Sequence, residues 1–135
     1  MNEDEAYLEV AQRYIDSCEQ HLNNGINYQE IIGFKSYHAF ESIAGAYNSH
    51  YGHNVPRSHP RKLNSFVTNC RNDNQVNSMA IATIAMTVHS MRNKYLYPEE
   101  NGTTYKTPQS QISLTDARGM VRRIHGIIRQ IERLI

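Results

Sequence analysis

Apolar side chains recur at steps of three and four residues in five separate stretches of the chain, and this spacing limits its fold more than any other feature. The last stretch shows it most clearly, with Ile124, Ile127, Ile128 and Ile131 in succession. Such spacing lines up one apolar stripe along a helix. We find no strand signal and no internal repeat. The pattern predicts an all-α fold, an antiparallel bundle of about five helices that forms a single domain over residues 1–135.

The ends of these helices follow from residues that start or stop helices. The expected helices cover about residues 3–22, 27–51, 59–70, 75–94 and 113–135. Asn27, with Glu30 three residues later, resembles a capping box at the start of the second helix. Ser58 is the expected N-cap of the third helix. Pro98 cannot lie inside a helix, so the fourth helix ends by about Leu96.

Three features bear on how these helices pack. Gly33 and Gly45 lie inside the second helix, where they allow a neighbour to approach closely or the helix to bend. The helix over residues 75–94 is the most apolar, so we expect it at the centre of the bundle. The polar connection over residues 97–112 is unusually long for a compact domain, which indicates a functional loop or a disordered one.

The charges are unevenly distributed along the chain, although the net charge is only +1. Residues 1–41 hold eight acids and two bases, which is a net charge of −6. The remainder holds five acids and twelve bases, which is a net charge of +7. This division indicates either a basic binding surface or self-association between unlike faces. The acidic start of the chain does not resemble a secretory signal, and no stretch is apolar enough to span a membrane. We therefore expect a cytoplasmic protein without membrane contact.

Metal and cofactor signals are missing. Cys18 and Cys70 lack the spacing of metal ligands, and we expect both to be buried in a reducing compartment, with a disulfide or a nucleophile as the alternatives. His50 and His53 flank a turn, without a matching motif for a metal ion. Glycine-rich phosphate loops and nucleophile elbows do not occur. The sequence predicts no metal site and no cofactor.

The end of the fourth helix carries the sharpest candidate for chemistry. His89, Arg92 and Asn93 fall on one helical face, where arginine offers a planar fork that matches phosphate oxygens. On the second helix, His38 and Glu41 lie one turn apart. If the two helices are neighbours, His38 and Glu41 face His89 and Arg92, and these four residues form a constellation suited to acid–base work on a phosphodiester. The alternatives are an Arg92 that pairs with carbonyls or with a carboxylate such as Glu41, and a solvated face with one satisfied histidine.

Two groups of basic residues could contact a nucleic-acid backbone. The last helix projects one basic stripe, made of Arg118, Arg122, Arg129 and Arg133. A second cluster stands at the start of the third helix and comprises Arg57, His59, Arg61 and Lys62. Such surfaces attract phosphates without sequence preference. The alternatives are a solvated helix face and pairing with the acidic first helix.

The order of these pieces resembles the HEPN superfamily, small helical domains of prokaryotic toxin–antitoxin, CRISPR and other defence systems. The resemblance covers roughly residues 30–135. It is carried by the second helix over residues 36–47, by the histidine-bearing segment over residues 59–66, and by Arg92-Asn93 near the end of the fourth helix. The family implies a homodimer, often with a composite groove at the two-fold axis, and many members are metal-independent ribonucleases.

The catalytic signature of that family is incomplete in this chain. It joins an arginine and a polar residue to a histidine a few positions later, but Tyr97, Pro98 and Glu99 occupy those positions after Arg92. This ending resembles a variant of non-toxic members that bind nucleotides or act as partners. The resemblance thus implies a domain that binds RNA or a nucleotide, or an accessory subunit, through Arg92, Asn93 and the basic residues.

Two other functions stay open at this point. One is a metal-independent endoribonuclease in which Arg92 works with a non-standard base, either His89 or His38, because a tyrosine with a pKa near 10 is a poor base. The other is a helical module whose partner is a protein from the same operon. The sequence leaves enzymatic activity undecided.

Overall fold

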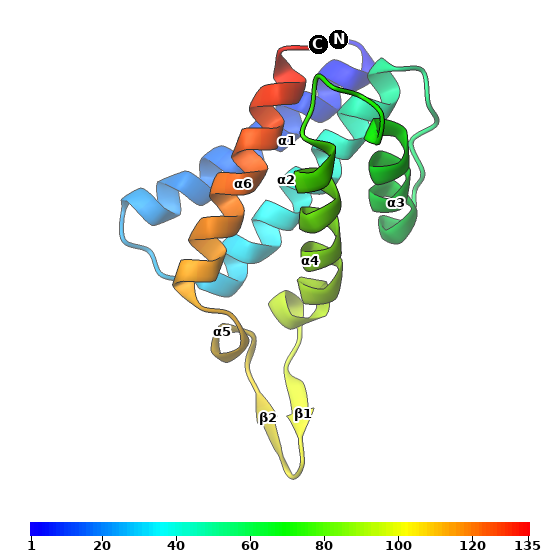
Figure 1. Ribbon diagram of the computed structural model, residues 1–135. Helices are drawn as coiled ribbons and strands as arrows, with labels where there is room; N and C mark the ends of the chain where they lie inside the picture. Colours follow the sequence, from blue (N-terminus) through cyan, green and yellow to red (C-terminus); the bar gives the residue numbers. More distant parts are fainter.

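Helix α2 (Gln29–His50) runs through the middle of the molecule, and the other long helices pack around it (Figure 1). The computed structural model describes residues 1–135. The remaining long helices are α1 (Glu3–Asn23), α3 (His59–Cys70), α4 (Ser78–Leu96) and α6 (Leu114–Glu132). The short helix α5 (Pro108–Gln111) precedes α6. The predicted all-α bundle is confirmed, and no helix is long and apolar enough to cross a membrane.

Side-chain caps explain where α3 and α6 begin. The Ser58 hydroxyl accepts a hydrogen bond from the Arg61 amide at the start of α3, as predicted. Ser113 does the same for the Asp116 amide at the start of α6. These bonds satisfy backbone donors that the first turn leaves free. The predicted cap at Asn27 is wrong, because α2 begins after Tyr28 and has no side-chain cap.

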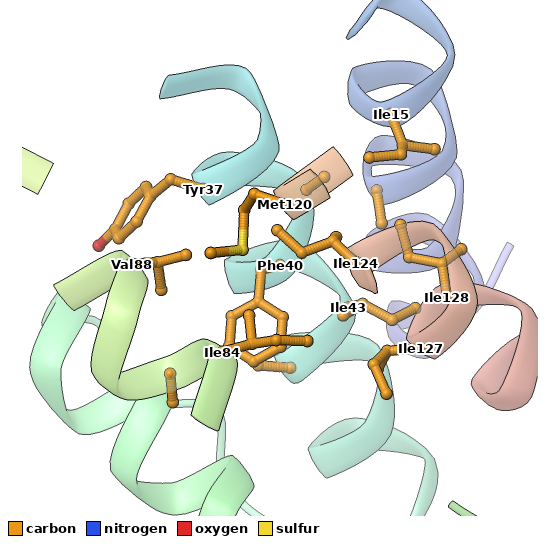
Figure 2. Close-up of a cluster of buried hydrophobic side chains, with 14 of the residues drawn as sticks. Ile15, Tyr37, Phe40, Ile43, Ile84, Val88, Met120, Ile124, Ile127 and Ile128 are labelled. Carbon is orange, nitrogen blue, oxygen red and sulfur yellow. The ribbon is translucent and has the colours of Figure 1, made fainter. Parts of the chain in front are cut away.

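The hydrophobic core lies between α2 and its neighbours. Figure 2 shows Phe40 of α2 beside Ile84 and Val88 of α4, with Ile124 of α6 on the side away from Val88 and Ile128 further from it. All five side chains are buried. Burial of such side chains contributes about 1.5 to 3 kcal/mol each, which makes this cluster the main source of stability.

The two glycines of α2 allow close packing, as the sequence indicated. A Cβ atom at Gly33 would lie 2.5 Å from Cε1 of Tyr95, and one at Gly45 would lie 2.8 Å from Cδ1 of Tyr7. Real Cβ atoms do not come so close to a neighbour. The rings of α1 and α4 therefore take the space that the missing side chains leave, which brings both helices close to α2.

The prediction that the fourth helix is central is wrong. Helix α2 buries 13 of its 22 residues, whereas α4 buries five of 19. The reason is that α2 meets α1, α3, α4 and α6, while one side of α4 meets no other element. The apolar residues of α4 surround the helix, and the chain covers only part of them.

The connection between α4 and α6 contains secondary structure that the sequence reading missed. Strands β1 (Glu99–Asn101) and β2 (Thr104–Lys106) form an antiparallel hairpin that projects from one end of the bundle (Figure 1). Glu99 pairs with Lys106, and Asn101 pairs with Thr104. Gly102 makes the turn with a φ of 64°, a left-handed conformation that suits glycine. All six strand residues are exposed.

Candidate functional site

Arg92 lies close to the ring of Tyr37, where α4 packs against α2. Its guanidinium carbon is 5.8 Å from the ring centroid, a distance at which the cation and the π-face attract each other. Its Nε atom is buried and has no hydrogen-bond partner. The Tyr37 hydroxyl is likewise buried and makes no hydrogen bond of good geometry, although Glu41 and Arg92 lie close enough to act on its pKa. Two neighbouring polar groups are thus removed from water without a well-placed acceptor from the protein.

Glu41 holds the start of α3 against α2 through both carboxylate oxygens. Its Oε2 accepts a hydrogen bond from Nδ1 of His59 at 2.7 Å, and its Oε1 lies 3.0 Å from Nζ of Lys62. Burial of the carboxyl alone would raise its pKa, but the bonds from Lys62 and His59 outweigh burial and hold the pKa below its usual 4.5. The carboxylate is therefore ionised at neutral pH.

This geometry decides which cation pairs with Glu41. The sequence offered Arg92 as a partner, but the carboxylate instead contacts His59 and Lys62, and Arg92 forms no ion pair. His59 and Lys62 are three positions apart on α3 and so face the same way. The ring of His59 lies 6.1 Å from that of Tyr37, so Tyr37 has His59 and Arg92 as neighbours.

His38 is packed among aromatic rings. It stacks on Tyr14 with the centroids 5.3 Å apart and meets the edge of Phe34 at 4.4 Å. Burial lowers the pKa of His38, although the nearby carboxylate of Glu41 acts in the opposite direction. The imidazole is therefore neutral at pH 7. It lies close enough to Glu41, His59 and Arg92 for their charges to influence it.

The other predicted residues of α4 point elsewhere. His89 lines an apolar groove between α3 and α4. Asn93 and Tyr97 are exposed and line a separate hollow of about 250 Å³ beside Pro98 and Gln111. The structure thus brings Arg92 together with His38 and Glu41, as the cross-bundle constellation required. It leaves His89, Asn93 and Tyr97 outside that group.

The basic stripe of α6 faces solvent and forms no ion pair. Arg118, Arg122, Arg129 and Arg133 are all exposed. The contact between α6 and the acidic α1 runs instead through His125 and Glu19.

Sequence reasoning did not assign Tyr37, His59 and Lys62 to the site. His59 and Lys62 were grouped with a basic surface, and Tyr37 was not singled out. The spacing of these residues along their helices does indicate that they could lie together. Tyr37 and Glu41 are four apart on one helix, and His59 and Lys62 are three apart on the next, so each pair lies on one face.

The arrangement fits an anion rather than a metal ion. No group of three or more His, Cys, Asp or Glu side chains lies together in a way that could hold a metal ion. Arg92 and Lys62 bring two positive charges to one negative charge on Glu41, and His59 adds a donor or, when protonated, a further charge. Guanidinium and ammonium groups beside a hydroxyl are typical of phosphate sites. We refer to Tyr37, Glu41, His59, Lys62 and Arg92 as the Arg92 cluster.

Comparisons with known proteins leave the family open. The chain matches no protein-family model, no curated protein and no solved structure. The resemblance to the HEPN superfamily stays a prediction from the sequence.

Proposed function

We propose that this chain is a HEPN-like domain that binds RNA or a nucleotide through a phosphate group at the Arg92 cluster. One observation carries the proposal: the buried Nε of Arg92 and the buried hydroxyl of Tyr37 lie together without hydrogen bonds of good geometry. A buried polar group without a hydrogen bond costs about 1 to 3 kcal/mol. Arg92 is only half-buried as a residue, so a turn of its side chain would bring Nε to a phosphate oxygen, and the ligand would then recover part of this cost.

The surrounding charges support an anionic ligand. Lys62 is fixed by Glu41 and so is held near the cluster with little loss of side-chain entropy on binding. The exposed basic stripe of α6 adds a longer-range attraction for a polyanion. The alternative within the same proposal is an accessory subunit of a prokaryotic toxin–antitoxin or defence system in the cytoplasm, with an operon-encoded protein as its partner.

The test compares two arginines on different faces. The affinity of a fluorescein-labelled single-stranded RNA is measured by anisotropy at fixed ionic strength for the wild type, Arg92→Gln and Arg122→Gln. We expect Arg92→Gln to weaken binding by about tenfold or more, and Arg122→Gln by about threefold or less. The reverse order would assign binding to the basic stripe, and no binding by the wild type at low salt would overturn the proposal.

A second candidate function is a metal-independent endoribonuclease, and the pairing of His59 with Glu41 favours it. A carboxylate accepts hydrogen bonds, so Nδ1 of His59 carries a proton, and in the neutral imidazole Nε2 has a free lone pair. The imidazole is 41% exposed, while the carboxylate is 7% exposed. This pairing is how a carboxylate orients a general base. Neither His89 nor His38 has such a partner.

In this candidate reaction, Nε2 of His59 takes the proton of a ribose 2′-hydroxyl, and the 2′-oxygen attacks the phosphorus. The bond from phosphorus to the 5′-oxygen breaks, and the departing oxygen takes a proton back from the imidazolium. Arg92 stabilises the charge on the phosphate. The wild type should then release 2′,3′-cyclic phosphate ends in the presence of a chelator, and His59→Asn should release none. Intact RNA after incubation with the wild type would exclude this candidate.

A further inference from the structure

A hollow lies between α1 and α2 and shares no residue with the Arg92 cluster. It has a volume of about 400 Å³, which is within the range of small-molecule sites. Four of its lining residues lie on one face of α1, because they are spaced as one helical stripe, and the fifth comes from α2. The lining residues are Val10, Arg13, Tyr14, Ser17 and Lys35. We refer to them as the Arg13 hollow.

The Arg13 hollow collects the only two bases of the acidic part of the chain. Residues 1–41 hold eight acids, yet neither Arg13 nor Lys35 forms an ion pair. Glu9 and Asp16 lie four and three positions from Arg13 on the same helix, at spacings that allow a surface ion pair. No acid lines the hollow. Two positive charges therefore border one space without a counterion from the protein.

Lys35 is already fixed at the edge of this space. Its ammonium group donates a hydrogen bond to the Ser17 hydroxyl at 2.9 Å, and this bond joins α2 to α1. Lys35 is half-buried, so its charge has lost part of its hydration. The Ser17 hydroxyl donates to no group of the protein, whereas the hydroxyls of Thr83 and Thr87 donate to carbonyls of their own helix. The ammonium and the Ser17 hydroxyl thus both have a donor free for a ligand.

The remaining lining of the hollow is largely apolar. The ring of Tyr14 stacks on His38, with the centroids 5.3 Å apart and the planes inclined by 20°, so its orientation is held. Val10 is 41% exposed and leaves apolar surface for a ligand to cover. No Asn, Gln, Asp or Glu lines the hollow, so the amino groups of a nucleic-acid base meet no amide or carboxylate acceptor there.

We propose that the Arg13 hollow binds a small phosphate monoester with an apolar body. A phosphate monoester carries a charge close to −2 at neutral pH, which Arg13 and Lys35 match. A phosphodiester or a monocarboxylate carries only −1 and leaves one cation unpaired. Arg13, Lys35 and Ser17 donate to the phosphate oxygens, and the apolar body covers Val10 and Tyr14.

This inference goes beyond the proposed function. It concerns a different part of the surface and a ligand that is neither RNA nor a nucleotide. Neither the site nor its ligand depends on the resemblance to the HEPN superfamily, since that resemblance begins at about residue 30 and four of the five lining residues precede it.

Isothermal titration calorimetry at pH 7.5 tests the ligand, with phenyl phosphate as the probe. We expect the wild type to bind phenyl phosphate about tenfold more tightly than each of three comparison compounds. Benzoate lacks the second charge, inorganic phosphate lacks the apolar body, and adenosine monophosphate brings a base that finds no acceptor. Equal affinities for all four compounds would overturn the inference.

Variants locate the site. Arg13→Gln and Lys35→Gln should each weaken the binding of phenyl phosphate by about tenfold, because each removes a charge-assisted hydrogen bond. Lys106→Gln is the matched control, since it removes an exposed cation from β2 and should bind as the wild type does. Arg13 is exposed, so Arg13→Gln tests the site even if Lys35→Gln disturbs the contact between α1 and α2. Circular dichroism checks the fold of each variant.

Arg92→Gln separates this site from the Arg92 cluster. This variant should weaken the binding of RNA and leave the affinity for phenyl phosphate unchanged. The inference is overturned if the wild type binds no phenyl phosphate up to about 10 mM. It is equally overturned if Arg92→Gln abolishes the binding and Arg13→Gln preserves it. Failure of the wild type to bind RNA would overturn the proposed function alone, because the two sites share no residue.

Discussion

Nδ1 of His59 donates a hydrogen bond to the buried carboxylate of Glu41 at 2.7 Å. This bond joins the first residue of α3 to the middle of α2. Lys62, one turn further along α3, binds the other carboxylate oxygen at 3.0 Å. The start of α3 is therefore fixed beside Tyr37 and Arg92, and the pairing contributes both to the stability of the fold and to the shape of the Arg92 cluster.

Loss of the Glu41 carboxylate should remove stability in a pH-dependent way. The pKa of Glu41 is lower in the folded protein than its ordinary value of 4.5. Its charge therefore adds stability that is present above about pH 4.5 and is lost as the pH falls through the folded pKa. We expect Glu41→Gln to lower the free energy of unfolding by about 1 to 3 kcal/mol at pH 7 and by much less at pH 3.

Urea unfolding at both pH values checks this expectation, with Glu9→Gln as the control. Glu9 is exposed and forms no ion pair, so its variant should match the wild type at each pH. A pH-independent loss in Glu41→Gln would mean that the residue acts through packing and not through its charge.

Substitution by alanine should lower the stability of the protein at a tightly packed glycine and raise it at a glycine in open space. A Cβ at Gly45 would meet the ring of Tyr7 at 2.8 Å, whereas one at Gly126 would meet nothing within 4 Å. We expect Gly45→Ala to destabilise the protein by about 1 to 3 kcal/mol through overpacking. Gly126→Ala should stabilise it by about 0.5 to 1 kcal/mol, because alanine favours the helix. The urea midpoints of the two variants measure both effects, and equal shifts would contradict the close contact at Gly45.

The helical fold followed from the sequence because each helix carries its own stripe and stop residues. The placement of the helices relative to one another did not follow from the sequence. Residue types made the helix over residues 75–94 the most apolar one, but centrality depends on how many neighbours a helix has. Helix α2 packs against all four of the other long helices, and Gly33 and Gly45 help to make this possible by admitting rings at close range. The apolar side chains of α4 are the ones that the chain leaves uncovered.

Within the site, the sequence indicated Arg92, His38 and Glu41 but not their partners. His59 reaches Glu41 only because Ser58 starts α3 at that point, and a contact between residues 18 positions apart has no local signal. The hairpin did have a signal in Asn101-Gly102, which is typical of tight turns between strands. The hairpin was missed because both strands are polar on both faces and show no alternation of apolar and polar residues.

The hydroxyl of Tyr37 should matter for ligand binding and not for folding. Burial raises the pKa of Tyr37, and the charge of Glu41 raises it further, so the hydroxyl stays protonated as a donor. It makes no hydrogen bond of good geometry in the protein, although Glu41 and Arg92 lie close to it. We expect Tyr37→Phe to change the free energy of unfolding by less than about 0.5 kcal/mol, because no bond is lost. RNA affinity should fall several-fold.

Tyr47→Phe is the matched comparison. The Tyr47 hydroxyl donates to Asp73 at 2.6 Å, so its removal should destabilise the protein by about 1 to 2 kcal/mol. RNA affinity should stay unchanged, since Tyr47 lies outside the Arg92 cluster. Equal stability losses in the two variants would show that the Tyr37 hydroxyl is hydrogen-bonded in the folded protein.

Binding of a phosphate group at Arg92 is the basis of the proposed function. The most direct measurement follows the side-chain Nε–H resonances of arginine by ¹H–¹⁵N NMR during a titration with a short single-stranded RNA, with Arg92→Gln used to assign one of them. The Arg92 resonance should shift most and become protected from exchange with water, because its Nε–H gains an acceptor. Shifts confined to Arg118, Arg122, Arg129 and Arg133, with Arg92 unchanged, would contradict it.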